Sequence, residues 1–266
     1  MSFDLFAYRE LRDTIRDCHD RYDEIELELQ GITQEQKKRL EEKQSETFVS
    51  QTEGFLALLE DELMSFHDVE FRGLTLTENE LIHLFYFKFQ EIPLLSRMDA
   101  VMEYFIDEYE TLHDCTLSEE DLDIIARKFE KLYVTRDLYK IYNKLLEENG
   151  YPALPDVPQE KRVLAYEDVY PLLYLKYRLC RVRDHKNIKH LVIDEMQDYS
   201  YLQYLILRQM FNCKMTILGD RAQTMEEQTH DVLEFLPGIF GKDIRKIILN
   251  KSYRNTVEIA EYANRT

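Results

Sequence analysis

A proline-rich segment divides this chain into two parts with different patterns. Residues 151–160 hold three of the six prolines, and proline both fixes φ and lacks the amide donor that a helix interior needs. Before this segment, apolar side chains recur every three or four positions, which is typical of amphipathic helices. After it, short apolar runs alternate with helical patterns. The sequence therefore predicts a largely helical N-terminal arm followed by an α/β region.

The start of the arm predicts a helical hairpin. One apolar stripe runs through residues 3–30, and another runs from Phe48 to Leu63. The segment Gln34–Gln44 between them is almost wholly polar, so we expect two long antiparallel helices joined through a solvated tip. Good helix-forming polar residues favour this interpretation over a binding site.

Capping residues mark the helices that follow. Thr77 with Glu80, and Ser118 with Asp121, each place a capping hydroxyl three residues before a carboxylate. A helix is expected from Pro93 to about His113, and another ends before Gly150. The Phe71–Leu74 segment is predicted to be extended.

Charge is distributed unevenly between the two regions. Residues 161–266 carry 17 Lys and Arg against 14 Asp and Glu, a balance of +3, which leaves 17 against 38, or −21, for residues 1–160. An acidic surface repels nucleic-acid phosphates. The arm by itself is therefore not expected to be a DNA-binding surface.

Several protein classes are excluded by simpler features. The apolar runs are too short to span a bilayer and no signal-peptide layout begins the chain, so we expect a cytoplasmic protein with no membrane contact. The four cysteines lie far apart without CxxC pairs, which predicts buried, reduced thiols rather than disulfides or a zinc site. These residues are Cys18, Cys115, Cys180 and Cys213.

The α/β region contains strands that end in polar turns. Leu191–Ile193 precedes Asp194 and Glu195, and Met215–Leu218 precedes Gly219 and Asp220. A third strand is expected at 247–249, and helices are expected from Ser200 to about Phe211 and from Asn255. Alternating strands and helices predict a parallel sheet, whose ligands gather at the carboxyl ends of the strands.

The segment LVIDEMQD carries the strongest chemical pattern. Two adjacent carboxylates directly beyond a strand allow Asp194 to bind Mg²⁺, a hard cation that prefers oxygen ligands, and Glu195 to orient or deprotonate a water molecule. A lone pair of this kind more often only caps a helix. The other two segments are individually weak: Gln223 in TILGDRAQT could bond a phosphate oxygen, and LNKSYRN offers Tyr253 for stacking and Arg254 for phosphoryl charge.

In order and spacing, DExQD, GDxxQ and a strand followed by SYRN resemble motifs II, III and IV of UvrD-like superfamily 1 helicases. The resemblance implies a RecA-like parallel αβα sheet of the P-loop NTPase type, with ATP and Mg²⁺ as cofactors. It implies that Asp194 binds the metal, Glu195 is the catalytic base, Gln223 senses the γ-phosphate and Arg254 reaches it. It further implies nucleotide contact by Tyr253, with Gln197 and Asp198 coupling and bracing motif II.

Within that family, DEMQDYS, the long preceding helical segment and the stretch 71–98 are most similar to HelD-type ATPases. This resemblance implies that residues 1–160 are an arm inserted in the first RecA-like domain, that 161–244 are part of that domain, and that 245–266 begin the second. It also implies partners: nucleic acid, and RNA polymerase whose main channel receives the acidic arm.

The chain departs from the family at one essential place. No GxxxxGK[ST] exists: at the single Gly241-Lys242 pair, Leu236 stands in place of the first glycine and Asp243 in place of Ser or Thr. The phosphate loop is therefore missing, as are motifs V and VI, which predicts a piece of a longer or split protein that is inactive alone. Unwinding members follow the GDxxQ glutamine with a small residue and a DNA-stacking aromatic, whereas here Thr224-Met225-Glu226-Glu227 follows Gln223, which lacks the stacking aromatic and adds negative charge.

Two other functions stay open. The chain could be a non-enzymatic acidic interaction module whose motor motifs are vestigial. It could also be a metal-dependent nuclease using Asp194, Glu195 and Asp220, although a nearby lysine and a basic groove would then be needed.

Overall fold

The computed structural model describes residues 34–181, 185, 187–219, 232–241 and 244–248. Its α-helices are α3 (Gln34–Lys43), α4 (Glu46–Glu62), α5 (Glu78–His83), α6 (Leu94–His113), α7 (Glu119–Glu130), α8 (Leu138–Glu148), α9 (Tyr166–Leu179), α10 (Tyr201–Met210) and α11 (Val232–Phe240). Its strands are β1 (Val69–Phe71), β2 (Leu74–Leu76), β3 (His190–Ile193) and β4 (Lys214–Ile217). Short π or 3₁₀ segments are η1 (Leu84–Lys88), η2 (Gln159–Lys161) and η3 (Met196–Asp198).

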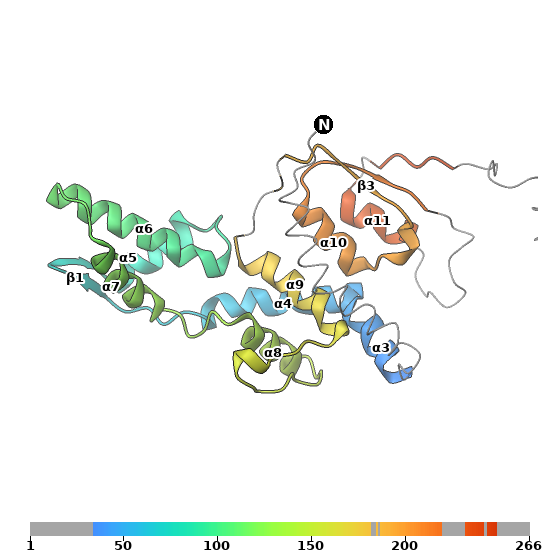
Figure 1. Ribbon diagram of the computed structural model, residues 1–266, viewed down its shortest axis with the longest axis horizontal. Coiled ribbons are helices and arrows are strands. Elements are labelled where there is room, and N and C mark those ends of the chain that lie inside the picture. The colour runs from blue at the N-terminus through green and yellow to red at the C-terminus, as the bar shows by residue number, and fades with distance from the viewer. Residues whose placement is uncertain (1–33, 182–184, 186, 220–231, 242–243, 249–266) are drawn as a thin grey trace, which may run out of the picture.

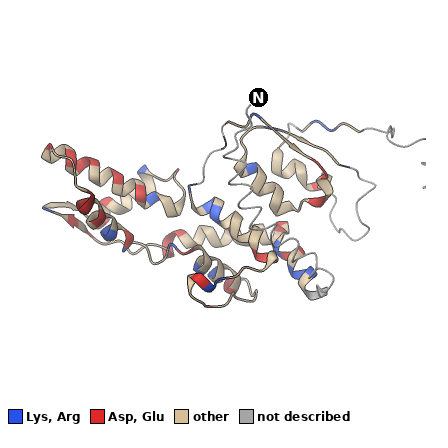
Figure 2. Cartoon of the chain, in the orientation of Figure 1, with Lys and Arg blue, Asp and Glu red and all other residues tan. Residues whose placement is uncertain are grey.

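The described part is mostly helical and elongated. At one end, the β1–β2 hairpin, α5, α6 and α7 form a lobe, shown on the left of Figure 1. At the other end, α10 and α11 lie beside β3 and β4, and the helices α4 and α9 lie between the two ends. We call residues 69–130 the acidic lobe, because they carry 15 Asp and Glu against 5 Lys and Arg. Figure 2 shows the positions of acidic residues in red along α6 and α7.

Local hydrogen bonds formed where the capping residues predicted them. The Thr77 hydroxyl accepts from the Glu80 amide and the Glu80 carboxylate accepts from the Thr77 amide, a complete capping box at the start of α5. Ser118 caps α7. Pro93 directly precedes α6, and Gly150 follows α8 with φ of 74°. The predicted helices are therefore confirmed. Their boundaries were predictable because each depends on groups only a few residues apart.

The segment 71–74, predicted to be extended, is extended only at its ends: Phe71 and Leu74 lie in β1 and β2, and the two residues between them form a hairpin turn. β1 and β2 pair antiparallel, with Phe71 opposite Leu74, so only two residues form the turn. Arg72 and Gly73 have φ of 44° and 89°, and positive φ at both turn positions matches the right-handed twist of hairpin strands. The Arg72 guanidinium donates to both carboxylate oxygens of Asp121, at 2.5 and 3.1 Å, and ties the turn to α7.

The expectation that the polar segment Gln34–Gln44 is a solvated tip is wrong for its last turn. α3 packs against α9, and Lys43 is only 2% exposed because its ammonium bonds Asp168. The second long helix is also divided in two, since Ser45 caps α4 and separates it from α3. The other half of the predicted hairpin, residues 3–30, lies outside the described residues.

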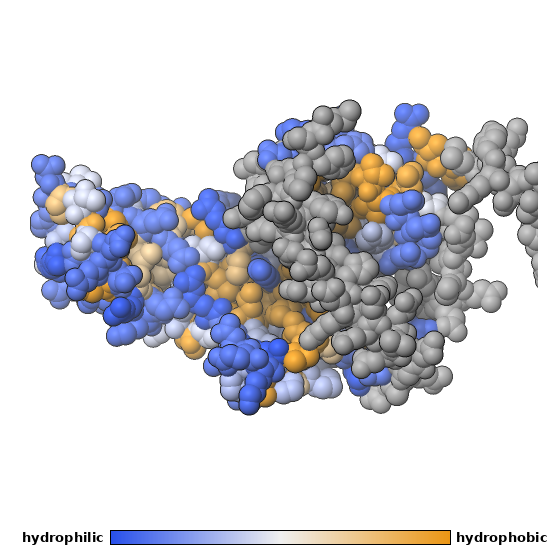
Figure 3. Space-filling model, viewed as in Figure 1, coloured by the Kyte–Doolittle hydropathy of each residue, from blue (hydrophilic) through white to orange (hydrophobic). Residues whose placement is uncertain are grey.

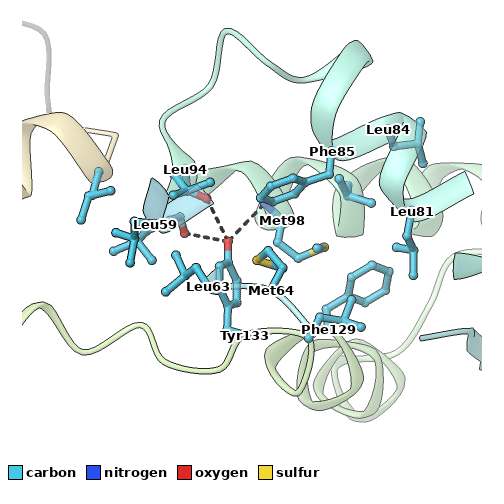
Figure 4. Close-up of a cluster of buried hydrophobic side chains, with 14 of the residues drawn as sticks. Leu59, Leu63, Met64, Leu81, Leu84, Phe85, Leu94, Met98, Phe129 and Tyr133 are labelled. Carbon is cyan, nitrogen blue, oxygen red and sulfur yellow. Dashed lines mark hydrogen bonds between the residues drawn. The ribbon is translucent and has the colours of Figure 1, made fainter. Parts of the chain in front are cut away.

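One apolar core joins the elements from α4 to α9. Phe48 and Leu59 on α4 and Leu175 and Leu179 on α9 belong to the same buried cluster. At its centre the Tyr133 hydroxyl lies 3.2 and 3.1 Å from the carbonyl oxygens of Leu94 and Leu95 and accepts from the Met98 amide (Figure 4). Burial raises the pKa of Tyr133 to about 12. The predicted domain boundary at residue 160 stays a prediction, and the core itself continues into α9.

The α/β region is confirmed as a small parallel sheet. β3 and β4 pair in parallel and α10 connects them, so the predicted strand–helix–strand order is present. The third strand is wrong as far as it can be followed: Ile247 and Ile248 lie in no sheet and are 70% and 68% exposed. The predicted helix at Asn255 lies outside the described residues. A RecA-like sheet would need further strands, so that finer assignment stays a prediction.

Helix α11 was not predicted, and Pro237 lies inside it. Its Val232 and Leu236 are buried against the sheet and α10. Figure 3 shows apolar side chains gathering in the middle of the molecule and at the upper right, whereas the acidic lobe at the left is mostly hydrophilic. A proline-containing helix is tolerated here because its apolar side packs on a neighbouring surface.

The cysteines differ from expectation in their burial. Cys115 is exposed, while Cys180 and Cys213 are half-buried, and all three are free; Cys18 lies outside the described residues. Burial raises the pKa of the Cys180 thiol, so it is less reactive as a nucleophile. Among the helices of the described residues, none combines the length and apolar character required to cross a membrane.

Candidate functional site

The candidate site lies where the two parallel strands end. β3 and β4 pair in register from His190 opposite Lys214 to Ile193 opposite Ile217. Ile193 and Ile217 belong to the cluster packed against α10 and α11, whereas Val192 on the opposite face is 60% exposed. Because side chains alternate along a strand, helices cover one face of this sheet and leave the other open within the described part.

The hydrogen-bond ladder continues beyond both strands, with one extra residue on the β3 side. The Leu218 amide donates to the Ile193 carbonyl at 2.8 Å, and the Leu218 carbonyl accepts from Met196 at 2.8 Å. In regular parallel pairing, residue 195 would make the second bond. Glu195 is therefore bulged out of the ladder, in the manner of a β-bulge.

The bulge holds Glu195 in a strained backbone conformation. Its φ is 49° and its ψ is 57°, the left-handed region, which costs a residue with a Cβ on the order of 1–2 kcal/mol. The Glu195 amide, displaced from the ladder, donates instead to Asp194 Oδ1 at 2.9 Å. This bond fixes the Asp194 carboxylate relative to the backbone of Glu195.

A buried amide holds the Glu195 carboxylate. Gln197 is only 8% exposed, and its Nε2 donates to Glu195 Oε2 at 2.7 Å. The other amide atom, Gln197 Oε1, is the single buried side-chain oxygen or nitrogen of the described residues without a hydrogen-bond partner. An unsatisfied buried acceptor costs about 1–3 kcal/mol, so the arrangement here is not the one that maximises stability.

Tyr204, on α10, holds the same turn through a hydrogen bond to its backbone. Its hydroxyl donates to the Met196 carbonyl at 2.9 Å, and it comes from α10, which a capping box at Ser200 and Gln203 begins. Burial raises the pKa of Tyr204, with the charges of Tyr199 and Asp198 adding to the effect, so the hydroxyl keeps its proton and stays a donor. The start of α10 therefore supports the turn that carries Glu195.

The two aspartates of the motif face solvent. Asp194 and Asp198 are both exposed, and the Asp198 amide donates to the Glu195 carbonyl at 2.9 Å in the 3₁₀ turn. Asp194 Oδ2 has no hydrogen bond with another described residue. In the part of the chain that the structure describes, no three His, Cys, Asp or Glu side chains converge as a metal cage. One exposed carboxylate nevertheless fits Mg²⁺, which keeps several waters and commonly takes only one or two protein oxygens alongside substrate phosphates.

Gly219 meets this turn from the end of β4. A Cβ on Gly219 would lie 2.3 Å from Met196 Cγ, 2.9 Å from Gln197 Oε1 and 2.9 Å from the Met196 amide nitrogen. The glycine is therefore needed for space. Sequence reasoning attributed a polar turn to this position but no specific role, and its only sign was the Gly-Asp pair after a strand.

Four of the seven predicted site residues lie on this turn: Asp194, Glu195, Gln197 and Asp198. The remaining three, Gln223, Tyr253 and Arg254, lie outside the described residues, as does Asp220 of the nuclease alternative. The structure thus brings together the metal and base candidates with their bracing amide.

No protein-family model matches the chain, and no curated protein matches it either.

Sequence reasoning missed a second polar cluster, which lies between α3, α8 and α9. Lys43 on α3, Asp168 on α9 and Tyr142 on α8 meet in the core, with both donors bonded to Asp168 Oδ1 at 2.5 and 2.7 Å. Nothing local could have found it, because Lys43 and Asp168 are 125 residues apart. Lys43 and Tyr142 each bond Asp168, and all three side chains are buried, so we interpret the cluster as a structural link between helices.

Proposed function

We propose that this chain is part of an ATP-dependent, superfamily 1 helicase-like motor, with Asp194 as the Mg²⁺ ligand and Glu195 as the base that orients or deprotonates the attacking water. Bound Mg²⁺ would neutralise charge on the phosphate oxygens. The single observation that carries the proposal is the DExQD turn at the carboxyl edge of two parallel strands, where Glu195 is bulged, strained and braced. Strained residues concentrate at functional sites.

The carboxylates have room to act in these roles. Gln197 occupies Glu195 Oε2, which leaves Oε1 as the oxygen available to a water molecule, and Asp194 keeps Oδ2 for a metal. Both side chains are exposed, so a nucleotide supplied with a phosphate loop can reach them. Because the phosphate loop is absent from the sequence, we expect the loop to come from another part of the same protein or a separate chain.

The experiment compares two proteins. The 266-residue chain with Mg²⁺ and ATP is expected to release no phosphate above background. A longer form that includes a GxxxxGK[ST] segment, or a mixture with the chain that supplies it, is expected to hydrolyse ATP, and Glu195→Gln should reduce kcat at least about 100-fold, as expected when a positioned general base is lost. Robust hydrolysis by the short chain, or an active Glu195→Gln enzyme, would contradict the assignment.

A second candidate, a non-enzymatic interaction module, is favoured by the charge of the acidic lobe. Eleven of its 15 acidic side chains are exposed and make no ion pair within the described part: Glu70, Glu78, Glu80, Glu91, Glu103, Asp107, Glu108, Asp114, Glu119, Glu120 and Asp123. Such a surface complements a basic partner and repels free nucleic acid. The resemblance to HelD-type proteins makes the nucleic-acid channel of RNA polymerase the first partner to test.

The partner test uses charge reversal on the outer face of α6. The double variant Glu103→Lys, Asp107→Lys should weaken binding to purified bacterial RNA polymerase and reduce its salt dependence. Glu147→Lys on α8, also exposed but outside the lobe, is the matched control. If polymerase binds neither the natural chain nor the variants, the polymerase partner is wrong. If Glu195→Gln in the longer form leaves its biological activity unchanged, the module is the better description.

A further inference from the structure

We propose that Gly219 and Gln197 are positioning residues that set which oxygen of the Glu195 carboxylate faces the reactant. The inference rests on the proposed function only for the role of Glu195 as a base. The contacts themselves concern how the end of β4 fixes the turn that follows β3.

The first step concerns Gly219. Its φ lies outside the left-handed region, so the backbone there suits any residue and only the space excludes a side chain. Of the three close contacts that a Cβ would make, Met196 Cγ could rotate away, but the Met196 amide nitrogen could not. That nitrogen donates to the Leu218 carbonyl, so moving it breaks the bond that closes the Glu195 bulge.

The second step concerns Gln197. Its amide has one atom on Glu195 and the other near Gly219: Nε2 donates to Glu195 Oε2, and the unpartnered Oε1 lies only 2.9 Å from the position that a Cβ of residue 219 would take. A rigid planar amide transmits a push on one atom to the other. Any side chain at position 219 therefore displaces the donor that holds the Glu195 carboxylate.

Together these contacts select one carboxylate oxygen. With Oε2 held by Gln197, Oε1 of Glu195 is left without a partner in the described part. A water molecule that binds Oε1 meets an acceptor whose direction is fixed before the reactant arrives, which is the condition for efficient general-base action.

The test reads the positions of these groups by NMR on the 266-residue chain, without any need for ATP hydrolysis. In the unsubstituted chain, Glu195 should show a strong nuclear Overhauser effect between its amide proton and its own Hα, because positive φ brings these two protons close together. The side-chain amide of Gln197 should show a resonance shifted by its hydrogen bond to the Glu195 carboxylate. Gly219→Ala should abolish the first and shift the second. Gly54→Ala and Gly238→Ala, at glycines with nothing within 4 Å of an added Cβ, should change neither.

A second variant keeps the proposal open to refutation if Gly219→Ala fails to fold. Gln197→Leu preserves shape and removes the amide, so the Glu195 carboxylate carbon should shift while resonances of α4 to α8 stay in place. Unchanged Glu195 resonances in Gln197→Leu, or in a folded Gly219→Ala, would overturn the inference.

A kinetic arm uses the longer, ATP-hydrolysing form. Gln197→Leu is expected to lower kcat about 100-fold with KM for ATP little changed, since a small misplacement of a catalytic group has that effect. If Gln197→Leu instead raised KM for ATP about 100-fold and left kcat unchanged, Gln197 would be a nucleotide-binding residue and the positioning role would be refuted. If the longer form has no activity at all, the proposed function fails while the NMR arm still decides the positions.

Discussion

Replacing Lys43 with methionine should destabilise this protein severely, although the sequence around Lys43 reads as an exposed polar helix. The side chain is 2% exposed, and its Nζ lies 2.5 Å from Asp168 Oδ1. The Tyr142 hydroxyl donates to the same oxygen at 2.7 Å. Burial and the charge of Asp168 raise the pKa of Tyr142, so this hydroxyl stays a donor.

The magnitude follows from what the substitution leaves behind. Lys43→Met keeps the methylene packing but leaves the Asp168 carboxylate buried with one neutral donor, and breaking a buried ion pair in this way costs about 3–5 kcal/mol. Tyr142→Phe removes one hydrogen bond to a charged group and should cost roughly 1.5–3 kcal/mol. The triple variant with Lys43→Met, Tyr142→Phe and Asp168→Leu leaves no polar group orphaned, so most of the loss should be recovered.

The assay is urea denaturation followed by circular dichroism, with the free energy of unfolding taken from the midpoint and slope. Lys38→Met is the matched control, because Lys38 lies on the same helix in an ion pair with Glu42 whose side chains are 75% and 45% exposed. Such a surface pair contributes about 0–1 kcal/mol. If Lys43→Met costs no more than Lys38→Met, or if the triple variant is less stable than Lys43→Met alone, the reasoning is refuted.

Three further predictions concern local groups. The pKa of Tyr133 is about 12 in the folded protein and about 10 in the unfolded chain. The contribution of Tyr133 to the free energy of unfolding is therefore complete below about pH 10 and is lost as pH rises toward the folded pKa. Tyr133→Phe should make the free energy of unfolding, measured by urea denaturation, depend less steeply on pH in this alkaline range. The hydrogen bonds from Arg162 lower the pKa of Asp137, so this contribution is present above an unfolded value near about 3.9 and is lost as pH falls; Asp137→Asn should give a shallower acid dependence of stability, and an unchanged slope would contradict this. Thr77→Ala removes the capping hydroxyl of α5 and should cost about 1 kcal/mol, measured by urea denaturation, whereas the same change at exposed Thr111 inside α6 should be close to neutral.

Most of the elements were predictable because their causes are local. The capping box at Thr77, the cap at Ser118 and the helix start after Pro93 each depend on bonds or sterics within a few residues. The parallel pair β3 and β4 was predictable from two apolar runs separated by a helical pattern. The predicted third strand failed over residues 247–248, since pairing needs a neighbouring strand that the pattern itself cannot supply.

The candidate site was predictable in its residue types and order but not in its geometry. The adjacent carboxylates of Asp194 and Glu195 after an apolar run indicated chemistry at a strand end. That Glu195 is bulged with positive φ, and that Gln197 holds its carboxylate, depends on how Leu218 and Gly219 approach from the neighbouring strand. Such contacts form only when two segments more than 20 residues apart are placed side by side.

The sequence by itself determined that a helical, acidic region precedes a parallel strand pair ending in DExQD, because composition, capping and periodicity act within a few residues of each other. Only the tertiary structure decided that Lys43 is buried on Asp168 and that Gly219 leaves no space beside Gln197. The physical reason is the same in both cases: burial and close contact are properties of pairs of residues far apart in the chain, and a polar residue reveals its partner only once the backbone has brought the two together.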